Sequence, residues 1–276
     1  MRWHQHQDFD DGAHEPNVSG GDHSFGLETV SDVQVNVTNA ALSVPNEVRS
    51  ARVEPVRVQS QGLGDGLWLI GGGSHNSVAV EFGDYVAVIE APLNEERSLA
   101  VIDEVNRLIP NKPIRFIVNT HHHWDHMGGI RSYVHEGATV ITHEGNHPYY
   151  QEVLRAGPWI LEPDRFSLYP PEEWSEGYIF ETMSEEFVLT DDSRTVEIYH
   201  VQGLAHAEGM LIAYIPSEKI VVQADLYFPE APTPNASART FHQNLQRLDL
   251  DVETIVGIHG SPAPMSKFVE FVDVGE

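Results

Sequence analysis

A chain of 276 residues, 41% of them hydrophobic, is long enough to bury a sizeable core in one large domain or two small ones. Its 42 acidic and 16 basic residues give a formal net charge of −26, which disfavours nucleic acid and anionic membranes as partners. The chain has no cysteine, so disulfides, thiolate metal ligands and a cysteine nucleophile are excluded.

The acidic composition is typical either of a protein adapted to high salt or of an ordinary soluble acidic protein, and both interpretations stay open. No stretch reaches the roughly 18 consecutive apolar residues of a membrane helix. Residues 1–11 are polar and acidic and do not resemble a secretory signal, which leaves a cytoplasmic protein and a processed, exported protein as alternatives. The sequence does not indicate an oligomeric state.

Residues 1–45 are rich in Asp, Gly, Asn, Ser and His and differ from the remainder. We expect a polar, acidic and mobile N-terminal arm there, followed by one folded domain over residues 46–276. The first predicted strands of that domain are short apolar runs separated by Gly and Asp, at residues 53–58, 67–70, 77–82 and 85–90. No Lys-Ser/Thr follows the triplet Gly71–Gly73, so it predicts a hairpin turn and not a phosphate loop.

A helix is predicted next, because apolar residues recur at helical spacing from Leu99 to Leu108, with Asn94 as N-cap and Pro110 just beyond the end. The further expected strands are 114–118, 138–142, 196–201, 210–215, 220–223 and 254–258, and the further expected helices are 147–155, 241–248 and a short C-terminal one. Strands that mix hairpins with helical crossovers predict an α/β protein with a helix layer over each sheet.

One long segment, residues 158–192, is interrupted by prolines and rich in aromatic residues. Such a segment can form a lid over a substrate, or it can pack onto the body of the domain. The sequence leaves both interpretations open.

The main chemical signal is the run Thr120-His121-His122-His123-Trp124-Asp125-His126 at the end of an apolar strand. Side chains alternate along a strand, so His121 and His123 share a face and can chelate one ion, whereas His122 points to the other face. Once the chain turns, Asp125 and His126 can address a second metal position nearby. Such a cluster is hard to explain as a structural feature alone, because buried imidazoles need partners.

Three further candidates lie in loops at or between strand ends. His206 lies in a glycine-flanked loop, Asp225 follows the apolar run Val221–Ala224, and His259 follows another apolar strand. Each alone would more often be a structural residue. Since strand ends at one edge of a sheet are where α/β sites are built, the three together complete a predicted metal site.

The His-x-His-x-Asp-His run, the later Gly-x-x-His loop, the strand-ending Asp and the final His-Gly resemble the motif series of the metallo-β-lactamase superfamily. This resemblance covers residues from about 50 to the C-terminus. It implies a four-layer αβ/βα sandwich with two mixed β-sheets and the metals at one edge. It also implies a first zinc on His121, His123 and His206, a second on Asp125, His126 and His259, and Asp225 as a bridging ligand.

The resemblance further implies two Zn²⁺ ions per chain. Subclasses with a thiolate ligand are excluded by the missing cysteine, and the imidazole at His123, where di-iron redox members have a carboxylate, favours zinc. In such hydrolases a metal-bound hydroxide attacks a carbonyl or phosphoryl centre. We expect Asp125 to be the catalytic residue that orients this nucleophile and transfers its proton to the leaving group.

The expected substrate is a small molecule, a cyclic amide or ester, with a β-lactam slightly preferred to a lactone. The alternatives are a lactonase, a glyoxalase II-type thioesterase or a phosphoester hydrolase, and, less favoured, a zinc-binding protein without catalysis. The acidic surface argues against a nuclease, and the lack of an evident basic cluster argues against an anionic, glutathione-like substrate.

Overall fold

The structure is a computed structural model that describes residues 44–52, 54–155, 163–169 and 180–273. The chain divides into two compact units, Met1–Val53 and Glu54–Glu276. The described part of the first unit contains one short helix, α1 (Asn46–Ser50). The mobility expected for residues 1–45 concerns a segment that, up to residue 43, lies outside the described residues.

The second unit contains a seven-stranded mixed sheet with the strands in chain order from β1 to β7. Antiparallel pairing joins β1 to β4, and parallel pairing joins β4 to β7. Its strands are β1 (Gln59–Gly64), β2 (Leu67–Gly72), β3 (His75–Glu81), β4 (Val86–Ile89), β5 (Ile114–Val118), β6 (Thr139–His143) and β7 (Phe180–Met183).

A six-stranded sheet of order β13-β12-β11-β10-β9-β8 forms the other half. In this sheet β11 and β12 run parallel, and the other neighbouring strands are antiparallel. Its strands are β8 (Glu186–Thr190), β9 (Thr195–His200), β10 (Leu211–Ile215), β11 (Ile220–Gln223), β12 (Thr254–Gly257) and β13 (Ala263–Pro264).

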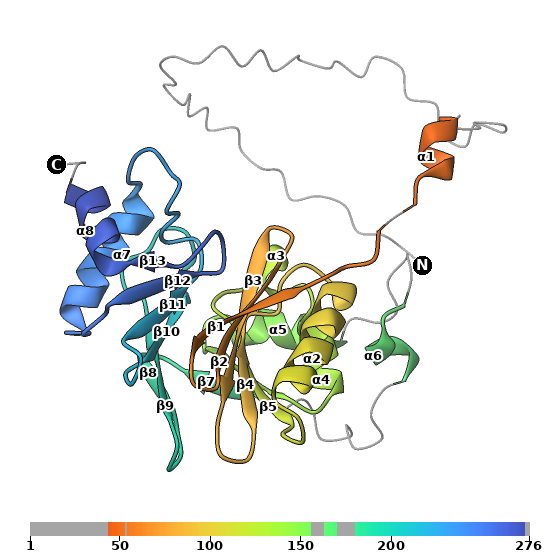
Figure 1. The fold of residues 1–276 in the computed structure, drawn as a ribbon, viewed down its shortest axis with the longest axis horizontal. Helices are drawn as coiled ribbons and strands as arrows, with labels where there is room; N and C mark the ends of the chain where they lie inside the picture. Colours follow the sequence, from red (N-terminus) through yellow and green to blue (C-terminus); the bar gives the residue numbers. More distant parts are fainter. Residues whose placement is uncertain (1–43, 53, 156–162, 170–179, 274–276) are drawn as a thin grey trace, which may run out of the picture. The chain divides into compact units, whose positions relative to one another are not determined.

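Helices cover the outer face of each sheet (Figure 1). On the first sheet they are α2 (Glu95–Leu108), α4 (Ile130–His135), α5 (His147–Arg155) and α6 (Arg165–Leu168); on the second they are α7 (Ala236–Arg247) and α8 (Met265–Asp273). The remaining helix of this unit, α3 (Trp124–Met127), follows the histidine run.

Three apolar cores fill the spaces between these layers. One lies between the two sheets and includes Val78, Val118, Leu211 and Val222, all less than 2% exposed. The other two lie between each sheet and its helices. Helix, sheet, sheet, helix is the predicted four-layer αβ/βα sandwich, so the fold prediction is confirmed.

The helix α2 follows the sequence signals closely. Its N-cap is Asn94, whose side chain accepts a hydrogen bond from the Arg97 backbone N–H at 2.9 Å, and its buried face includes Val101 and Val105. The Asn94 side chain thereby satisfies one of the backbone donors that a helix start leaves free. The hairpin predicted at the glycine triplet is also confirmed, because Gly72 pairs with His75.

The predicted strand at residues 53–58 is wrong for its described part, since residues 54–58 have no strand and pairing begins at Gln59. The Gln-Ser-Gln-Gly-Leu-Gly strand β1 has little intrinsic strand preference and forms because it pairs with β2. In the aromatic segment 158–192, residues 156–162 and 170–179 lie outside the described residues, whereas β7 and β8 are part of the sheets. No helix in the described part of the chain is long and apolar enough to cross a membrane.

Candidate metal centre

The predicted ligands come together where parallel strands of both sheets end. Glu90 directly follows β4, Asp225 follows β11, and the His121–His126 run begins three residues after β5. His259 lies two residues beyond β12. The carboxyl ends of parallel strands meet at one sheet edge, so the fold collects residues that are far apart in the sequence.

Two groups of four donors lie here, joined by a buried trio of Glu90, His121 and His126. The first group of four consists of His121, His123, His206 and Asp225. His121 Nε2 lies 3.0 Å from His123 Nδ1, and His206 Nε2 lies 3.0 Å from Asp225 Oδ2. Each residue offers one ligand atom, and all four atoms lie within 4.8 Å of one another. His206 is one third exposed, so this group borders solvent.

The second donor group consists of His75, Asp125, His126 and His259, again with its ligand atoms within 4.8 Å of one another. Asp125 Oδ2 lies 3.5 Å from His75 Nε2 and 3.7 Å from His126 Nε2. His259 Nε2 lies 3.4 Å from His126 Nε2. In this group His126 is fully buried and His75 is 5% exposed, whereas Asp125 is one third exposed and borders solvent.

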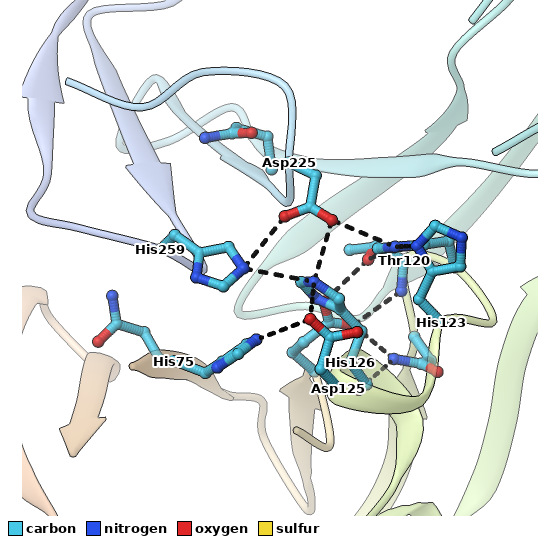
Figure 2. A network of polar contacts seen from close by, with 12 residues as sticks. His75, Thr120, His123, Asp125, His126, Asp225 and His259 are labelled. Carbon is cyan, nitrogen blue, oxygen red and sulfur yellow. Dashed lines mark hydrogen bonds and ion pairs between the residues drawn. The ribbon is translucent and has the colours of Figure 1, made fainter. Parts of the chain in front are cut away.

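The Asp225 carboxylate lies between the two groups. Its Oδ2 is 3.0 Å from His206 Nε2 in the first group and 3.1 Å from His126 Nε2 in the second. Its Oδ1 is 3.1 Å from His259 Nε2 (Figure 2). Asp225 takes a left-handed backbone conformation, with φ of 60°, which an Asp tolerates better than most residues.

Contacts on the far ring nitrogens orient the imidazoles. His126 Nδ1 lies 2.8 Å from the buried Glu90 Oε2, His259 Nδ1 lies 3.1 Å from the Ser74 carbonyl, and His121 Nδ1 lies 3.0 Å from Thr120 Oγ1. When Nδ1 carries the proton, the Nε2 lone pair is free to bind a metal. Such outer contacts are typical of metal-binding histidines.

Several imidazoles are held in the neutral form that binds metals. Burial lowers the pKa of His121 and His123, and it lowers the pKa of His75 to about 4 with a further contribution from the charges of His259 and His126. Neutral imidazole is the ligand form, so these shifts favour metal uptake at neutral pH.

The buried acids stay ionised. Burial alone would raise the pKa of Asp225, but hydrogen bonds from His121, His126 and His259 hold it well below its usual range. Burial would likewise raise the pKa of Glu90, yet its bond with His126 lowers it. For His126 the effect of burial is outweighed by bonds to Asp225 and Glu90, which raise its pKa to about 10. A metal that binds His126 therefore displaces a proton.

The donor spacing fits metal ions. Two ligand atoms about 2.0–2.1 Å from one zinc ion at a tetrahedral angle are roughly 3.4 Å apart. The contacts within each group span 3.0 to 3.7 Å. All donors are imidazole nitrogens and carboxylate oxygens, the ligands that suit zinc in a protein without cysteine. Both groups are able to hold a metal ion.

Comparison with known proteins places the chain in a family. The model of the metallo-beta-lactamase superfamily matches residues 70–259, a range that begins just before His75 and ends at His259. The chain belongs to the metallo-beta-lactamase superfamily. The family predicted from the sequence motifs is therefore confirmed.

Solved metallo-beta-lactamases share the fold. The enzyme from Pontibacter korlensis is 15% identical with a TM-score of 0.61, and the alignment covers 79% of this chain and 98% of that one. FIM-1 from Pseudomonas aeruginosa, in its mono-zinc form, is 18% identical with a TM-score of 0.58, covering 81% and 97%. At this level of identity the likeness concerns the fold alone.

One curated relative is named for a reaction other than β-lactam hydrolysis. The 2,4-dinitroanisole O-demethylase subunit alpha of Nocardioides sp. (strain JS1661) is 23% identical over 221 residues, which is 79% of this chain. The chain spans 60% of the length of that relative. The superfamily likeness therefore does not restrict the chain to one reaction.

The structure brings all seven predicted metal residues of this superfamily member into one cluster. His121, His123 and His206 lie in one donor group, and Asp125, His126 and His259 lie in the other. That these residues bind metal ions stays a prediction. Asp225 contacts both groups. His122 stays outside both groups, with Nδ1 3.0 Å from Asn146 Oδ1.

Sequence analysis missed two residues of the centre. His75 is the first residue of β3, and Glu90 directly follows β4. A lone histidine after a glycine turn carries no metal signal by itself. Glu90 offered a weak sequence signal, since an acidic residue ends an apolar strand there as Asp225 does. In the structure its φ of 78° is unusual for a Glu.

Proposed function

We propose that this chain is a dinuclear zinc-dependent hydrolase that cleaves a carbonyl group in a small cyclic amide or ester. The observation that carries the proposal is the position of Asp225, whose two oxygens lie within 3.1 Å of imidazoles from both donor groups. A carboxylate placed in this way is suited to link two metal ions a few ångströms apart, as two-metal hydrolytic sites require.

His121, His123 and His206 would hold the first zinc ion and Asp125, His126 and His259 the second, with Asp225 reaching both. Zinc in such a site supplies Lewis acidity and lowers the pKa of water to about 7. The chain supplies the orientation of the donors: Glu90 fixes His126, the Ser74 carbonyl fixes His259, and Thr120 fixes His121. No serine, cysteine or lysine nucleophile is needed.

Asp125 is suited to move the proton. Its carboxylate is one third exposed, whereas Glu90 is fully buried and Asp225 is only 12% exposed. Of these three acids, Asp125 is the most accessible to water. We assign it the role of accepting the proton of the attacking water and returning it to the leaving group, which is general base and then general acid catalysis.

The surroundings favour a small substrate without strong negative charge. Lys112 precedes β5 and pairs with Glu81 at 2.7 Å, and Lys219 precedes β11 and pairs with Glu253 at 2.8 Å. Both lysines therefore lie at the strand ends opposite to the metal centre. A thioester of an anionic carrier is less favoured for this reason.

Aromatic side chains flank the centre instead. Trp124, between His123 and Asp125 in the chain, is 68% exposed. The ring of Phe228 lies 5.6 Å from that of His259. Such faces suit the apolar part of a small ring.

The test combines metal analysis with turnover. Protein purified without added metal is assayed for zinc, and for hydrolysis of a chromogenic β-lactam, a chromogenic lactone, a thioester and a phosphodiester. We expect two zinc ions per chain and chelator-sensitive turnover of the lactam or the lactone. Two zinc ions with turnover of the thioester or phosphodiester alone would refute the substrate class. Iron in place of zinc, or inertness towards the whole panel, would refute the hydrolase.

A second candidate is the cleavage of an activated aryl methyl ether, which the name of the curated relative suggests. In 2,4-dinitroanisole, addition of water and loss of the ether bond give 2,4-dinitrophenol and methanol. The substrate is a flat uncharged ring, in keeping with the exposed Trp124 beside the centre and with the position of Lys112 and Lys219 away from it. Release of the yellow dinitrophenol is measured in the same panel, and faster turnover than with lactam or lactone would make this candidate the function.

A further inference from the structure

The second donor group contains a histidine that the two-metal assignment above does not use. His75 begins β3 and is 5% exposed. Among the described residues its buried Nε2 has no hydrogen-bond partner, and the nearby Asp125 Oδ2 lies 3.5 Å away. A buried polar atom without a partner costs free energy, so its presence calls for a ligand. Figure 2 shows the ring of His75 directed towards Asp125, on the side of the centre where His259 and His126 also lie.

We infer that His75 is a fourth protein ligand of the second metal position, through Nε2, beside Asp125, His126 and His259. This inference rests on the proposed metal centre but not on its substrate. Nε2 lies 3.5 Å from Asp125 Oδ2, the spacing of two donors of one ion. The His75 ring centre lies 4.1 Å from that of His259 and 5.1 Å from that of His126.

The far nitrogen of His75 is engaged in the way expected of a ligand. Its Nδ1 lies 2.8 Å from Ser74 Oγ. If Nδ1–H donates to this hydroxyl, the Nε2 lone pair points into the donor group. Ser74 also provides the carbonyl that contacts His259 Nδ1 at 3.1 Å, so one residue orients two imidazoles of the second group.

The backbone at His75 is held from two sides. The guanidinium of Arg97, itself 1% exposed, donates to the carbonyl oxygens of His75 at 3.1 Å, Ile70 at 3.0 Å and Gly72 at 3.2 Å. On the other side, Asn76 donates its backbone N–H to Ile258 O at 2.7 Å, next to His259. A buried arginine that donates to three carbonyls of one hairpin fixes the backbone position of His75 relative to the other donors.

This assignment makes the two metal positions unequal. The second position has the four residues of its group plus Asp225, five protein donors in all, whereas the first has four including Asp225. The first position has one protein donor fewer, which would leave more room there for a substrate atom.

The experiment replaces the ligand nitrogen without removing the Ser74 contact. In His75→Asn the amide nitrogen takes the place of Nδ1, and nothing takes the place of Nε2. Loss of an outer contact to a metal-binding histidine typically weakens metal affinity 10–100-fold. For loss of the ligand itself we expect at least about 100-fold weaker binding of the second cobalt or zinc ion, with the first unchanged. Titration with Co²⁺, followed by visible absorption, measures both steps.

His122→Asn is the matched control, because it makes the same replacement within the histidine run at a residue outside both donor groups. It should keep both binding steps and both absorption bands. X-ray absorption of the two-zinc protein should lose one imidazole nitrogen in His75→Asn and none in His122→Asn. Far-UV circular dichroism of both metal-free variants tests the fold.

Ser74→Ala is a second variant that leaves Nε2 in place. It should weaken the second metal step about 10-fold without loss of an imidazole from the X-ray absorption spectrum. Equal affinity for the second ion, within twofold, in His75→Asn and the wild-type protein would overturn the inference, as would an unchanged nitrogen count. These readouts need no substrate, so a failed substrate proposal and a failed ligand assignment are distinguishable.

Discussion

The two sheets contribute to the metal centre in different ways. The first sheet supplies four ligand candidates from one short run, His121 to His126, which begins three residues after β5, and a fifth, His75, from the start of β3. The second sheet supplies His206, Asp225 and His259 from three separate loops. Neither set is complete alone, since each group of four donors includes residues from both sheets. A local cluster therefore brings most of the ligand chemistry, and the packing of the two sheets sorts the donors into two groups.

Hydrogen bonds join the two sheets beside the centre. The Leu211 N–H donates to Thr120 O at 2.8 Å, Asn76 Nδ2 donates to Gly257 O at 2.9 Å, and Asn146 Nδ2 donates to Gly209 O at 2.9 Å. Further from the centre the sheets meet through apolar side chains. Substitutions of Asp225, of a residue in one donor group and of a residue that links the sheets therefore test how far the two sheets depend on each other.

The largest effect is expected for Asp225→Asn, which removes the carboxylate shared by the two groups. Asparagine tolerates the φ of 60°, so the fold should survive. Metal analysis should give fewer than two zinc ions per chain, and hydrolysis should fall more than about 100-fold, because both positions lose a ligand. Asp249→Asn is the control, since Asp249 also has positive φ, at 51°, but is exposed at the end of α7. Full retention of both ions in Asp225→Asn would contradict the shared role.

Asp125→Asn should have the next largest effect, and it alters the second group only. The variant should remain folded and keep the first metal, while the rate falls by about 100- to 10,000-fold because the proton acceptor is lost. Initial rates with the best substrate of the panel, together with metal analysis, measure both effects. Near-wild-type turnover would remove Asp125 from the mechanism.

A smaller effect is expected at a link between the sheets. Asn146 is 4% exposed and contacts both His122 and the Gly209 carbonyl. In Asn146→Ala the free energy of unfolding should drop by about 1–3 kcal/mol, since a buried carbonyl loses its donor. Urea unfolding of the metal-free protein measures it. A stability equal to that of the wild type would mean that the Asn146 link does not contribute to joining the sheets.

The smallest effect is expected on the outer helices of the first sheet. Asp164 caps α6 and pairs with Arg131; burial would raise its pKa, but these bonds lower it below the usual value. A lowered folded pKa stabilises the protein above the unfolded value near 4, and this contribution is lost as the pH falls further. Asp164→Asn should cost about 1 kcal/mol at pH 7 and less below pH 4, with unchanged activity. Melting curves of both proteins at pH 7 and pH 3 test whether the loss of stability in the variant is smaller at the lower pH.

Much of the fold could be predicted because its signals are local. The helix α5 and the strand β11 have the predicted bounds, and α2 begins after its predicted cap. The strand β1 was missed because Gln, Ser and Gly give no strand pattern, and only pairing with β2 makes it a strand. The short helices α3 and α4 were missed as well, since they are too short to display helical periodicity.

The candidate site was predictable to a similar extent and for the same reason. The run around His121 and the strand-ending Asp225 stand out in the sequence, whereas His75 does not. The position of His75 depends on its contact with Arg97 and on the hydrogen bond from Asn76 to the second sheet. Neither contact produces a recognisable sequence motif around residue 75. Residues that only tertiary packing brings to a site cannot be read from their neighbours in the chain.

The contacts of Asn76 also set an order of events during folding. They join residues 181 and 184 positions apart in the chain, and closing such a loop costs entropy before the contact forms. On the ribosome, the histidines after β5 emerge long before β12 and His259. The second donor group is therefore complete only after the last part of the chain has joined the fold.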